Sequence, residues 1–362
     1  MRLFTCATCG QSIHFDNRYC VKCGSRLAFI PDMVALEALQ PAGEPLWSLV
    51  SSPERQVRFC ANEVHDICNW AIPAEQDGEF CEVCKHNRLV PDASTAVGLE
   101  RWRRISQAQR HLFYSLLRLR LPVPDRLQDP QSGLVFDFLV DEVTPDGNII
   151  PAMTGHEEGL IAIRAAEADD ATREQVRSNM NEPYRTMLGH FRHETGHFIW
   201  NKLVRDANRF EAFRAVFGDE TQDYAEALER NYQSGPPEGW QENYISTYAA
   251  SHPWEDFAEC FAHYLHIIDT LETAGSFGMA IEPEGHKEMA AEVEFDPYKA
   301  RSAEQLVSVW VPLSVAMNSI HRSMGQGDLY PFVVTPVVTA KLQFIHELVH
   351  GDISTDQARL AG

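Results

Sequence analysis

The sequence predicts an α+β protein in which small, metal-stabilised modules at the amino-terminal end precede a mainly helical domain with a small sheet. Three observations lead to this prediction. Eight of the nine cysteines lie within the first 84 residues, strand-like apolar runs occur at 134–140 and 159–164, and helical patterns dominate from Arg173 onward. The chain has 362 residues, of which 44% are hydrophobic, so it is long enough for two domains with a buried core.

The first cysteine cluster consists of two matching Cys-x2-Cys-Gly motifs. Each motif can place two thiolates on one side of a metal ion, and the following glycine relieves the tight turn that this geometry requires. Clustered cysteines in a chain without an export signal are typical of metal sites rather than disulfides. We therefore predict a structural zinc site in residues 1–30, with the ligands Cys6, Cys9, Cys20 and Cys23.

A second, less regular cysteine cluster follows in residues 31–98, which we predict to be a second zinc-binding module. Its expected zinc ligands are Cys60, Cys68, Cys81 and Cys84, of which only the last two have Cys-x2-Cys spacing. His65 and His86 are close enough in the sequence to be substitute ligands, so a set that includes a histidine is the alternative. The ninth cysteine, Cys260, stands alone and is expected to be a small core residue.

Residues 99–130 are predicted to form a basic linking helix. Six arginines and no acidic residue occur between residues 101 and 120, and the prolines of Leu121-Pro-Val-Pro-Asp125 end the helix. The arginines can contact either nucleic-acid phosphates or carboxylates of the same chain. The net charge is −21, and all of it falls in residues 131–362, where 16 Lys+Arg stand against 37 Asp+Glu. This acidity favours the internal contacts and disfavours nucleic acid as a partner.

Two segments contain the pattern His-Glu-x-x-His, which places two histidines on one face of a helix with a glutamate between them. In the first segment an apolar stripe lies opposite the face of His193 and His197, so that helix can seat in a core and present both histidines to a cleft. The second, His346 to His350, is expected to be an ordinary terminal helix. We therefore predict a metal site at the first segment, where Glu194 acts as the general base.

A catalytic zinc needs a third protein ligand and an open fourth position. Trp200 and Leu203 stand where a glycine and a third histidine would extend the motif, so the ligand must come from elsewhere. A second helix, expected to begin near Pro253, carries Glu255 and Glu259 one turn apart. We predict Glu255 as the third ligand, with Asp256 as the alternative. Glu259 is expected to accept the free N–H of a ligating histidine and so fix its tautomer.

These motifs resemble the gluzincin type of metallopeptidase. The spacing from Tyr248 to Glu255 and Glu259 is similar to the lethal-factor-like branch, in which the tyrosine supports the transition state and the first glutamate binds zinc. More of the chain resembles a bacterial family of zinc-binding metallopeptidases with amino-terminal zinc ribbons. The matching segments are the Cys-x2-Cys-Gly motifs, Cys68-Asn-Trp70, His193 to Phe198, Pro253 to Glu259, Asn318 to Met324 and Tyr330-Pro-Phe332.

The resemblance implies a zincin-like catalytic domain with carboxyl-terminal helices in residues 131–362. It also implies that Tyr248 donates a hydrogen bond to the developing oxyanion, and His252 is a weaker candidate for that role.

The expected function is a zinc-dependent metallopeptidase, a hydrolase of peptide bonds with one catalytic and two structural zinc ions, acting on a peptide or protein. The alternative is a nucleic-acid-binding or regulatory protein with zinc ribbons and an inactive peptidase-like domain. The amino-terminal sequence has no signal-peptide pattern, and no uncharged stretch reaches the roughly 18 residues of a membrane span. We therefore expect a cytoplasmic protein without membrane contact.

Overall fold

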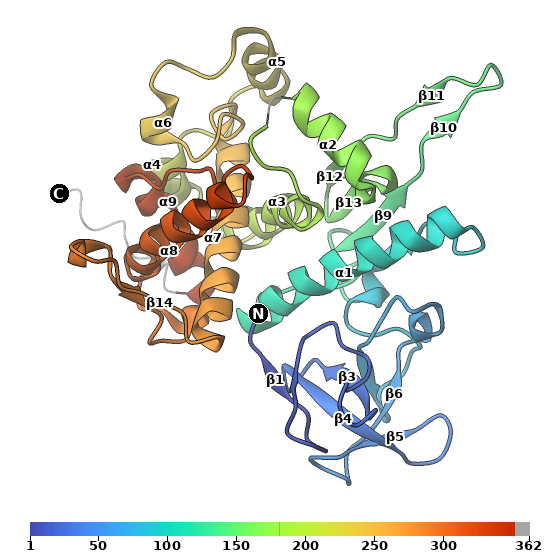
Figure 1. Ribbon diagram of the computed structural model, residues 1–362. Coiled ribbons are helices and arrows are strands. Elements are labelled where there is room, and N and C mark those ends of the chain that lie inside the picture. Colours follow the sequence, from blue (N-terminus) through green and yellow to red (C-terminus); the bar gives the residue numbers. More distant parts are fainter. Residues whose placement is uncertain (181, 352–362) are drawn as a thin grey trace. The chain divides into compact units, whose positions relative to one another are not determined.

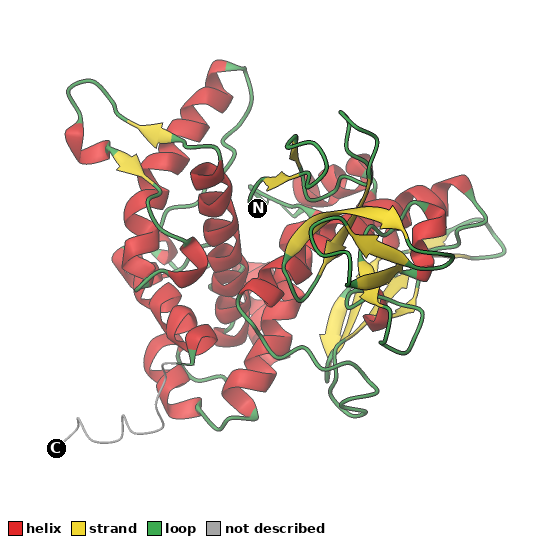
Figure 2. Cartoon of the chain, turned by 90° about the horizontal axis from the view of Figure 1, so that it is seen from below, coloured by secondary structure: helices red, strands yellow, loops and turns green. Residues whose placement is uncertain are grey.

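The computed structural model describes residues 1–180 and 182–351, and the chain divides into two compact units, Met1–Met180 and Asn181–Gly362 (Figure 1). The first unit contains most of the strands, whereas the second consists mainly of helices (Figure 2). This confirms the predicted α+β fold with a mainly helical carboxyl-terminal part. Residues 352–362 of the predicted catalytic domain lie outside the described residues.

The first unit begins with a short hairpin and an antiparallel meander. The strands are β1 (Phe4–Thr5), β2 (Ser12–Ile13), β3 (Arg26–Ile30), β4 (Ala35–Pro41), β5 (Trp47–Leu49), β6 (Gln56–Phe59) and β7 (Ala71–Pro73), and β3 to β7 pair in chain order. The short helix η1 (Ala61–His65) precedes β7. The meander buries Leu39, Leu49 and Val57 in its core. Phe29 on β3 donates its backbone N–H to Asn69 O at 2.8 Å, so β3 also contacts the chain beside Cys68.

A second sheet in this unit contains the two strands predicted between residues 134 and 164. Its order is β12 (Gly155–Glu157), β13 (Leu160–Arg164), β9 (Val135–Leu139) and β8 (Asn87–Leu89). The pairs β13–β9 and β9–β8 are parallel, with Ile161 opposite Phe136. Between β9 and β13 along the chain, residues 144–148 connect the two strands of a separate hairpin, β10 (Glu142–Val143) and β11 (Ile149–Ile150). The sheet packs on α1 (Ala96–Arg118) through Phe113 and Phe136, whose ring centroids are 6.3 Å apart.

The arginines of α1 contact acidic groups of the same unit. Arg101 lies 2.6 Å from Asp169, and Arg104 lies 3.3 Å from Asp170. Both acids are at the start of α2 (Asp170–Asn179), which follows η3 (Ala165–Ala168). Arg110 donates to a backbone carbonyl and lies 3.5 Å from Asp16. The basic helix therefore makes the internal ion pairs that were expected from the acidity of the rest of the chain.

The boundary between the two compact units lies at residue 180, and this division does not test the predicted bounds at residues 30, 98 and 130. The parallel pairing of β8 with β9 joins the cysteine-rich region to the strands after residue 131, so these strands belong to the first unit. Such pairing across α1 is a tertiary feature that no local pattern encodes. The predicted four-part division stays a prediction.

In the second unit, helices surround the central helix α7. They are α3 (Met187–Trp200), which continues into the π-helical turn η4 (Asn201–Arg205), then α4 (Phe210–Phe217), α5 (Tyr224–Ser234), α6 (Trp240–Asn243), α7 (Pro253–Ser276), α8 (Ala303–Ser323) and α9 (Pro336–His350). A hairpin of β14 (Ala280–Ile281) and β15 (Ala291–Glu292) and the short helices η5 (Lys287–Met289) and η6 (Pro297–Lys299) lie between α7 and α8. Figure 1 shows α7 as the long light-orange helix among α3, α8 and α9. In the described residues no helix combines the length and apolar character needed to cross a membrane.

The close packing of α3 on α7 depends on a glycine. A Cβ added at Gly196 would lie 3.0 Å from Ala258 Cα and 3.2 Å from Ala258 O, closer than almost all real Cβ contacts. Because Gly196 has no side chain, the two helices approach until their backbones nearly touch. His193 and His197 on α3 therefore face the amino-terminal turns of α7.

Candidate metal centres

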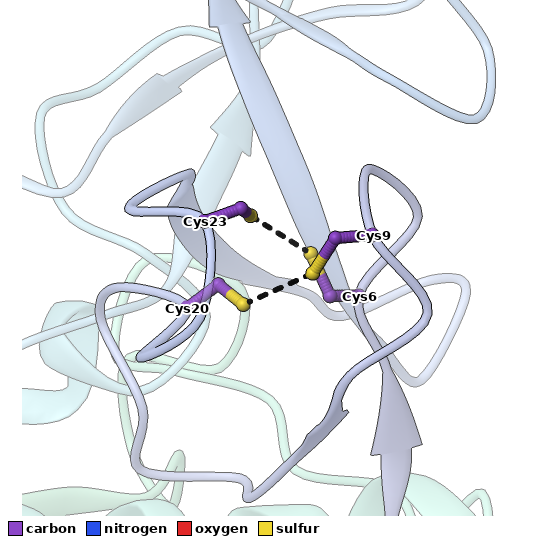
Figure 3. A group of neighbouring side chains, drawn as sticks. All are labelled: Cys6, Cys9, Cys20 and Cys23. Carbon is purple, nitrogen blue, oxygen red and sulfur yellow. Dashed lines mark hydrogen bonds between the residues drawn. The ribbon is translucent and has the colours of Figure 1, made fainter.

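The first cysteine cluster has the geometry of a zinc ribbon (Figure 3). The Sγ atoms of Cys6 and Cys23 are 3.8 Å apart, and those of Cys9 and Cys20 are 3.6 Å apart. A disulfide would require about 2.05 Å, whereas the edge of a tetrahedron with Zn–S bonds of about 2.3 Å is about 3.8 Å. Gly10 and Gly24 have φ of +72° and +74°, so the glycine after each motif does adopt the left-handed turn conformation. The four sulfurs thus fit a structural zinc ion.

The second cluster consists of cysteines only, and all four are buried. Cys60, Cys68, Cys81 and Cys84 can together hold one metal ion, and the Sγ atoms of Cys68 and Cys81 are 3.5 Å apart. The two candidate substitute ligands lie elsewhere. His65 packs against Trp102, and His86 Nδ1 lies 2.8 Å from Leu134 O. Burial lowers the pKa of His86 to about 4. This cluster fits a second structural zinc ion.

The third group combines the first His-Glu-x-x-His helix with α7. His193 Nε2 lies 3.2 Å from His197 Nε2 and 3.0 Å from Glu255 Oε2, and His197 Nε2 lies 3.3 Å from the same oxygen. A tetrahedral zinc ion with bonds of about 2.0–2.2 Å to nitrogen and oxygen requires ligand separations of about 3.3 Å. Three buried ligand atoms therefore form one face of such a tetrahedron. These three ligands leave the fourth corner of the tetrahedron to water or substrate, as a catalytic zinc site requires.

Helix caps and spacing hold the ligands in place. Thr186 caps α3 by accepting a hydrogen bond from Gly189 N at 3.0 Å, and His193 and His197 stand four positions apart on one face of the helix. The carboxylate of Glu255 lies in the first turn of α7, where the helix dipole favours negative charge. His252 Nδ1 caps this helix by accepting a hydrogen bond from Trp254 N at 3.1 Å. The imidazole of His252 thus contacts the helix backbone, and this placement does not support the prediction that His252 donates a hydrogen bond to the oxyanion.

Glu259, one turn after Glu255, contacts the outer nitrogen of His193. Its Oε1 lies 2.8 Å from His193 Nδ1, so the imidazole can donate there and direct Nε2 toward Glu255. The other oxygen of Glu259 accepts a 2.6 Å hydrogen bond from the hydroxyl of Ser246. The structure thus brings Glu259 to the place predicted for it, and it adds Ser246 behind it.

The electrostatics of the three-residue group favour a bound cation. Burial alone would raise the pKa of Glu255, but the neighbouring histidines hold it well below its usual range. Burial alone would lower the pKa of His193, but hydrogen bonds to Glu255 and Glu259 outweigh that effect and raise it well above its ordinary value. The buried carboxylate of Glu255 and the partly buried one of Glu259 are therefore stabilised by a positive charge between them, which protons on the histidines or a metal ion can supply.

Glu194 and Tyr248, the predicted catalytic residues, both lie beside this group. Glu194 is buried, and its Oε1 lies 3.3 Å from His190 Nε2, one turn earlier on α3. The Tyr248 ring centroid lies 5.8 Å from that of His193. Burial, followed by the charge of Glu255, raises the pKa of Tyr248 well above its ordinary value, so its hydroxyl stays protonated and can donate a hydrogen bond.

The alternative ligand, Asp256, is placed away from the histidines, so that prediction is wrong. Its Oδ2 lies 2.5 Å from Lys341 Nζ on α9, and its Oδ1 accepts a 3.5 Å contact from the Cys260 thiol. Consecutive residues of a helix point about 100° apart, so Glu255 and Asp256 cannot both face α3. Cys260 is buried, as expected for a core residue.

The second His-Glu-x-x-His segment lies on α9, which buries His346 and leaves His350 exposed. His346 Nδ1 lies 2.9 Å from Tyr264 Oη, and His350 Nε2 lies 3.2 Å from Tyr298 O. The intervening Glu347 accepts a 2.8 Å hydrogen bond from Gln343. Within residues 1–180 and 182–351 these histidines join no group of three potential metal ligands. This agrees with the expectation of an ordinary terminal helix.

Tyr224 is a site residue that sequence reasoning missed. Its hydroxyl donates a 2.5 Å hydrogen bond to Glu255 Oε1, the oxygen that faces away from the histidines. Tyr224 begins α5, 31 residues before Glu255, and no motif or periodicity connects the two positions. Ser246 was missed for the same reason. A polar residue in a loop gives no local signal of the distant carboxylate it contacts.

Comparison with known proteins agrees with this geometry. A family model described as "Putative zinc-binding metallo-peptidase" matches residues 98–348, and a zinc-ribbon domain model matches residues 3–95, which span both cysteine clusters. Uncharacterized proteins of Mycobacterium tuberculosis and Mycobacterium bovis are 41% identical over 352 residues, which cover 96% of this chain and 95% of theirs. No solved structure matches the chain significantly. The family model covers the helices that carry both parts of the His/Glu group, and the chain therefore belongs to this zinc-binding metallo-peptidase family, with a zinc-ribbon domain at its amino-terminal end.

Proposed function

We propose that the protein is a zinc-dependent metallopeptidase that hydrolyses peptide bonds at a site formed by His193, His197, Glu255 and Glu194. The observation that supports this most directly is the triangle of Nε2, Nε2 and Oε2 atoms, whose edges of 3.0–3.3 Å suit one zinc ion. When bound there, zinc lowers the pKa of a water molecule to about 7 and polarises a carbonyl group.

The residues of the chain divide the remaining tasks. Glu194 takes the proton as water attacks the peptide carbonyl, and it then delivers that proton to the leaving amine, a role worth on the order of 10²–10⁴ in rate. The protonated hydroxyl of Tyr248 donates to the oxygen on which negative charge develops. Glu259 keeps His193 in the tautomer whose Nε2 can bind metal.

The acidity of the chain and the internal ion pairs of α1 support a peptidase over a nucleic-acid-binding protein. Three of the six arginines that could contact phosphates, Arg101, Arg104 and Arg110, lie beside Asp169, Asp170 and Asp16. Phosphate binding would have to break these pairs. We propose a peptide or protein as the substrate and no nucleic-acid partner.

The decisive experiment compares Glu194→Gln with Glu347→Gln. The two variants make the same change in the two His-Glu-x-x-His segments, one beside the proposed zinc and one in the core helix α9. We expect three zinc ions per chain in all proteins, cleavage of a fluorogenic peptide library by the wild type and Glu347→Gln, and a loss of 10²-fold or more in Glu194→Gln. Equal cleavage by both variants, or no cleavage of any library peptide by the wild type, would refute the proposal.

A further inference from the structure

The two carboxylate oxygens of Glu255 have different surroundings. Oε2 lies within 3.3 Å of both imidazoles, whereas Oε1 accepts the hydrogen bond from Tyr224. At 2.5 Å this bond has the length of a charge-assisted O–H···O⁻ contact, which is about twice as strong as a neutral one. The carboxylate is therefore held from the side opposite the histidines.

The position of the Tyr224 hydroxyl is itself fixed by the fold. Asp223 caps α5 by accepting a hydrogen bond from Glu226 N at 2.9 Å, which sets the start of the helix. The Tyr224 ring makes edge contacts with two residues that flank Pro253, at centroid distances of 5.3 Å to His252 and 5.8 Å to Trp254. The amino-terminal end of α7, which carries Glu255, thus packs directly against this ring.

We propose that Tyr224 is a positioning residue for the metal ligand Glu255: its hydroxyl holds Oε1 and so presents Oε2 alone to the zinc ion. A free carboxylate can bind a metal through one oxygen or both, and binding through both would use the position that water and substrate need. A donor on Oε1 favours binding through one oxygen. The inference rests on the proposed function only in that Glu255 must bind zinc.

Besides Glu255, the Tyr224 hydroxyl has a hydrogen-bond partner in Tyr248, which is not one of the metal ligands, so zinc affinity reports on the contact with Glu255. Tyr224 is 36% exposed, so the change Tyr224→Phe leaves no buried cavity and keeps the ring contacts with His252 and Trp254. Tyr232, two turns later on α5, is 65% exposed and offers a matched control. The change Tyr232→Phe removes a hydroxyl from the same helix without touching Glu255.

The test measures zinc affinity, which does not depend on peptidase activity. Full-length wild type, Tyr224→Phe and Tyr232→Phe are dialysed against a moderate chelator until metal analysis shows that only the two cysteine sites keep zinc. Zn²⁺ is then titrated into each protein in competition with a fluorescent chelator, and the melting temperature is recorded before zinc is added. We expect Tyr224→Phe to bind the third zinc 10–100-fold more weakly than wild type, and Tyr232→Phe to match the wild type.

Each outcome has one meaning. Equal affinity of wild type and Tyr224→Phe would overturn this inference and leave the proposed function intact. A loss of affinity with a matching fall in the melting temperature of the zinc-depleted variant would also overturn it, because general damage would explain both. A wild type that takes up no third zinc would refute the proposed function, and this inference with it.

Discussion

The buried ion pair between Asp256 and Lys341 gives the sharpest stability prediction. Asp256 is fully buried next to Glu255, and 5% of the Lys341 side chain is exposed. Lys341 Nζ lies 2.5 Å from Asp256 Oδ2 and also donates to Asn243 O at 2.6 Å, so it ties α9 to both α7 and α6. The change Lys341→Met keeps most of the apolar part of the side chain but leaves the buried carboxylate of Asp256 without a positively charged partner.

The cost follows from the burial of both partners. Removing one partner of a buried pair typically destabilises by about 3–5 kcal/mol. The part of this cost that depends on ionisation is smaller: with a folded pKa of about 6, adding a proton to Asp256 of the wild type at pH 7 costs about 1.4 kcal/mol. We therefore expect Lys341→Met to lower the free energy of unfolding by about 4 kcal/mol at pH 7.

The loss should depend on pH. Burial raises the pKa of Asp256 to about 6 even though Lys341 opposes the shift. A carboxyl group whose folded pKa is raised stabilises the fold most below pH 4, and this contribution is lost as the pH rises through 6. At pH 5 the wild type and the variant both carry the proton, so their difference should fall by about 1.4 kcal/mol, the free energy of one pH unit of ionisation, to about 2.6 kcal/mol.

Urea unfolding of the wild type, Lys341→Met and the double variant Asp256→Leu/Lys341→Met at pH 7 and pH 5 tests this reasoning. The double variant removes both charges and should recover most of the stability. Two results would contradict the argument: a loss below 1 kcal/mol in the single variant at pH 7, or a double variant less stable than the single one.

Two further predictions concern helix packing and the zinc ribbons. Gly196→Ala should lower the free energy of unfolding by about 1–3 kcal/mol and weaken binding of the third zinc ion, since its Cβ must displace Ala258 on α7. Thermal unfolding checks this against the control Gly327→Ala, whose Cβ would meet nothing within 4 Å. Equal melting temperatures of the two variants would argue against the close approach of α3 and α7. A chelator should remove zinc from the first cysteine site before the second, because Cys23 is exposed whereas the second site is buried throughout. Once the proposed catalytic zinc has been removed, Cys23→Ser should abolish only the faster of the two remaining phases of zinc release, and a single remaining phase in the wild type would disagree with this difference in burial.

Features that depend on neighbours along the chain could be predicted from the sequence. The Cys-x2-Cys-Gly motifs need only a tight turn, and both glycines after the first cluster's motifs have the positive φ that this turn requires. Likewise, the spacing of His193 and His197 and of Glu255 and Glu259 needs only a regular helix, and α3 and α7 provide it. The helix start at Pro253 follows from the missing N–H of proline, which costs nothing in a first turn.

Features that depend on distant partners could not be predicted. The parallel pairing of β8 with β9 spans the whole of α1 and places the strands after residue 131 in the first compact unit. The contacts of Tyr224 with Glu255 and of Lys341 with Asp256 join positions 31 and 85 residues apart. Because these contacts are set by helix packing, the sequence offered Glu255 and Asp256 as neighbouring candidates but no local feature to choose between them.

The two His-Glu-x-x-His segments show what separates a metal-binding group from a motif. Both lie on helices, so both place two imidazoles one turn apart, and the local spacing is identical. On α3 the glycine within the motif lets α7 come close enough to bring Glu255 to both nitrogens. On α9 the corresponding position is Val349, which is buried, and His346 contacts a tyrosine hydroxyl instead of a carboxylate. The third ligand is thus delivered by helix packing, and the small residue between the histidines is what permits that packing.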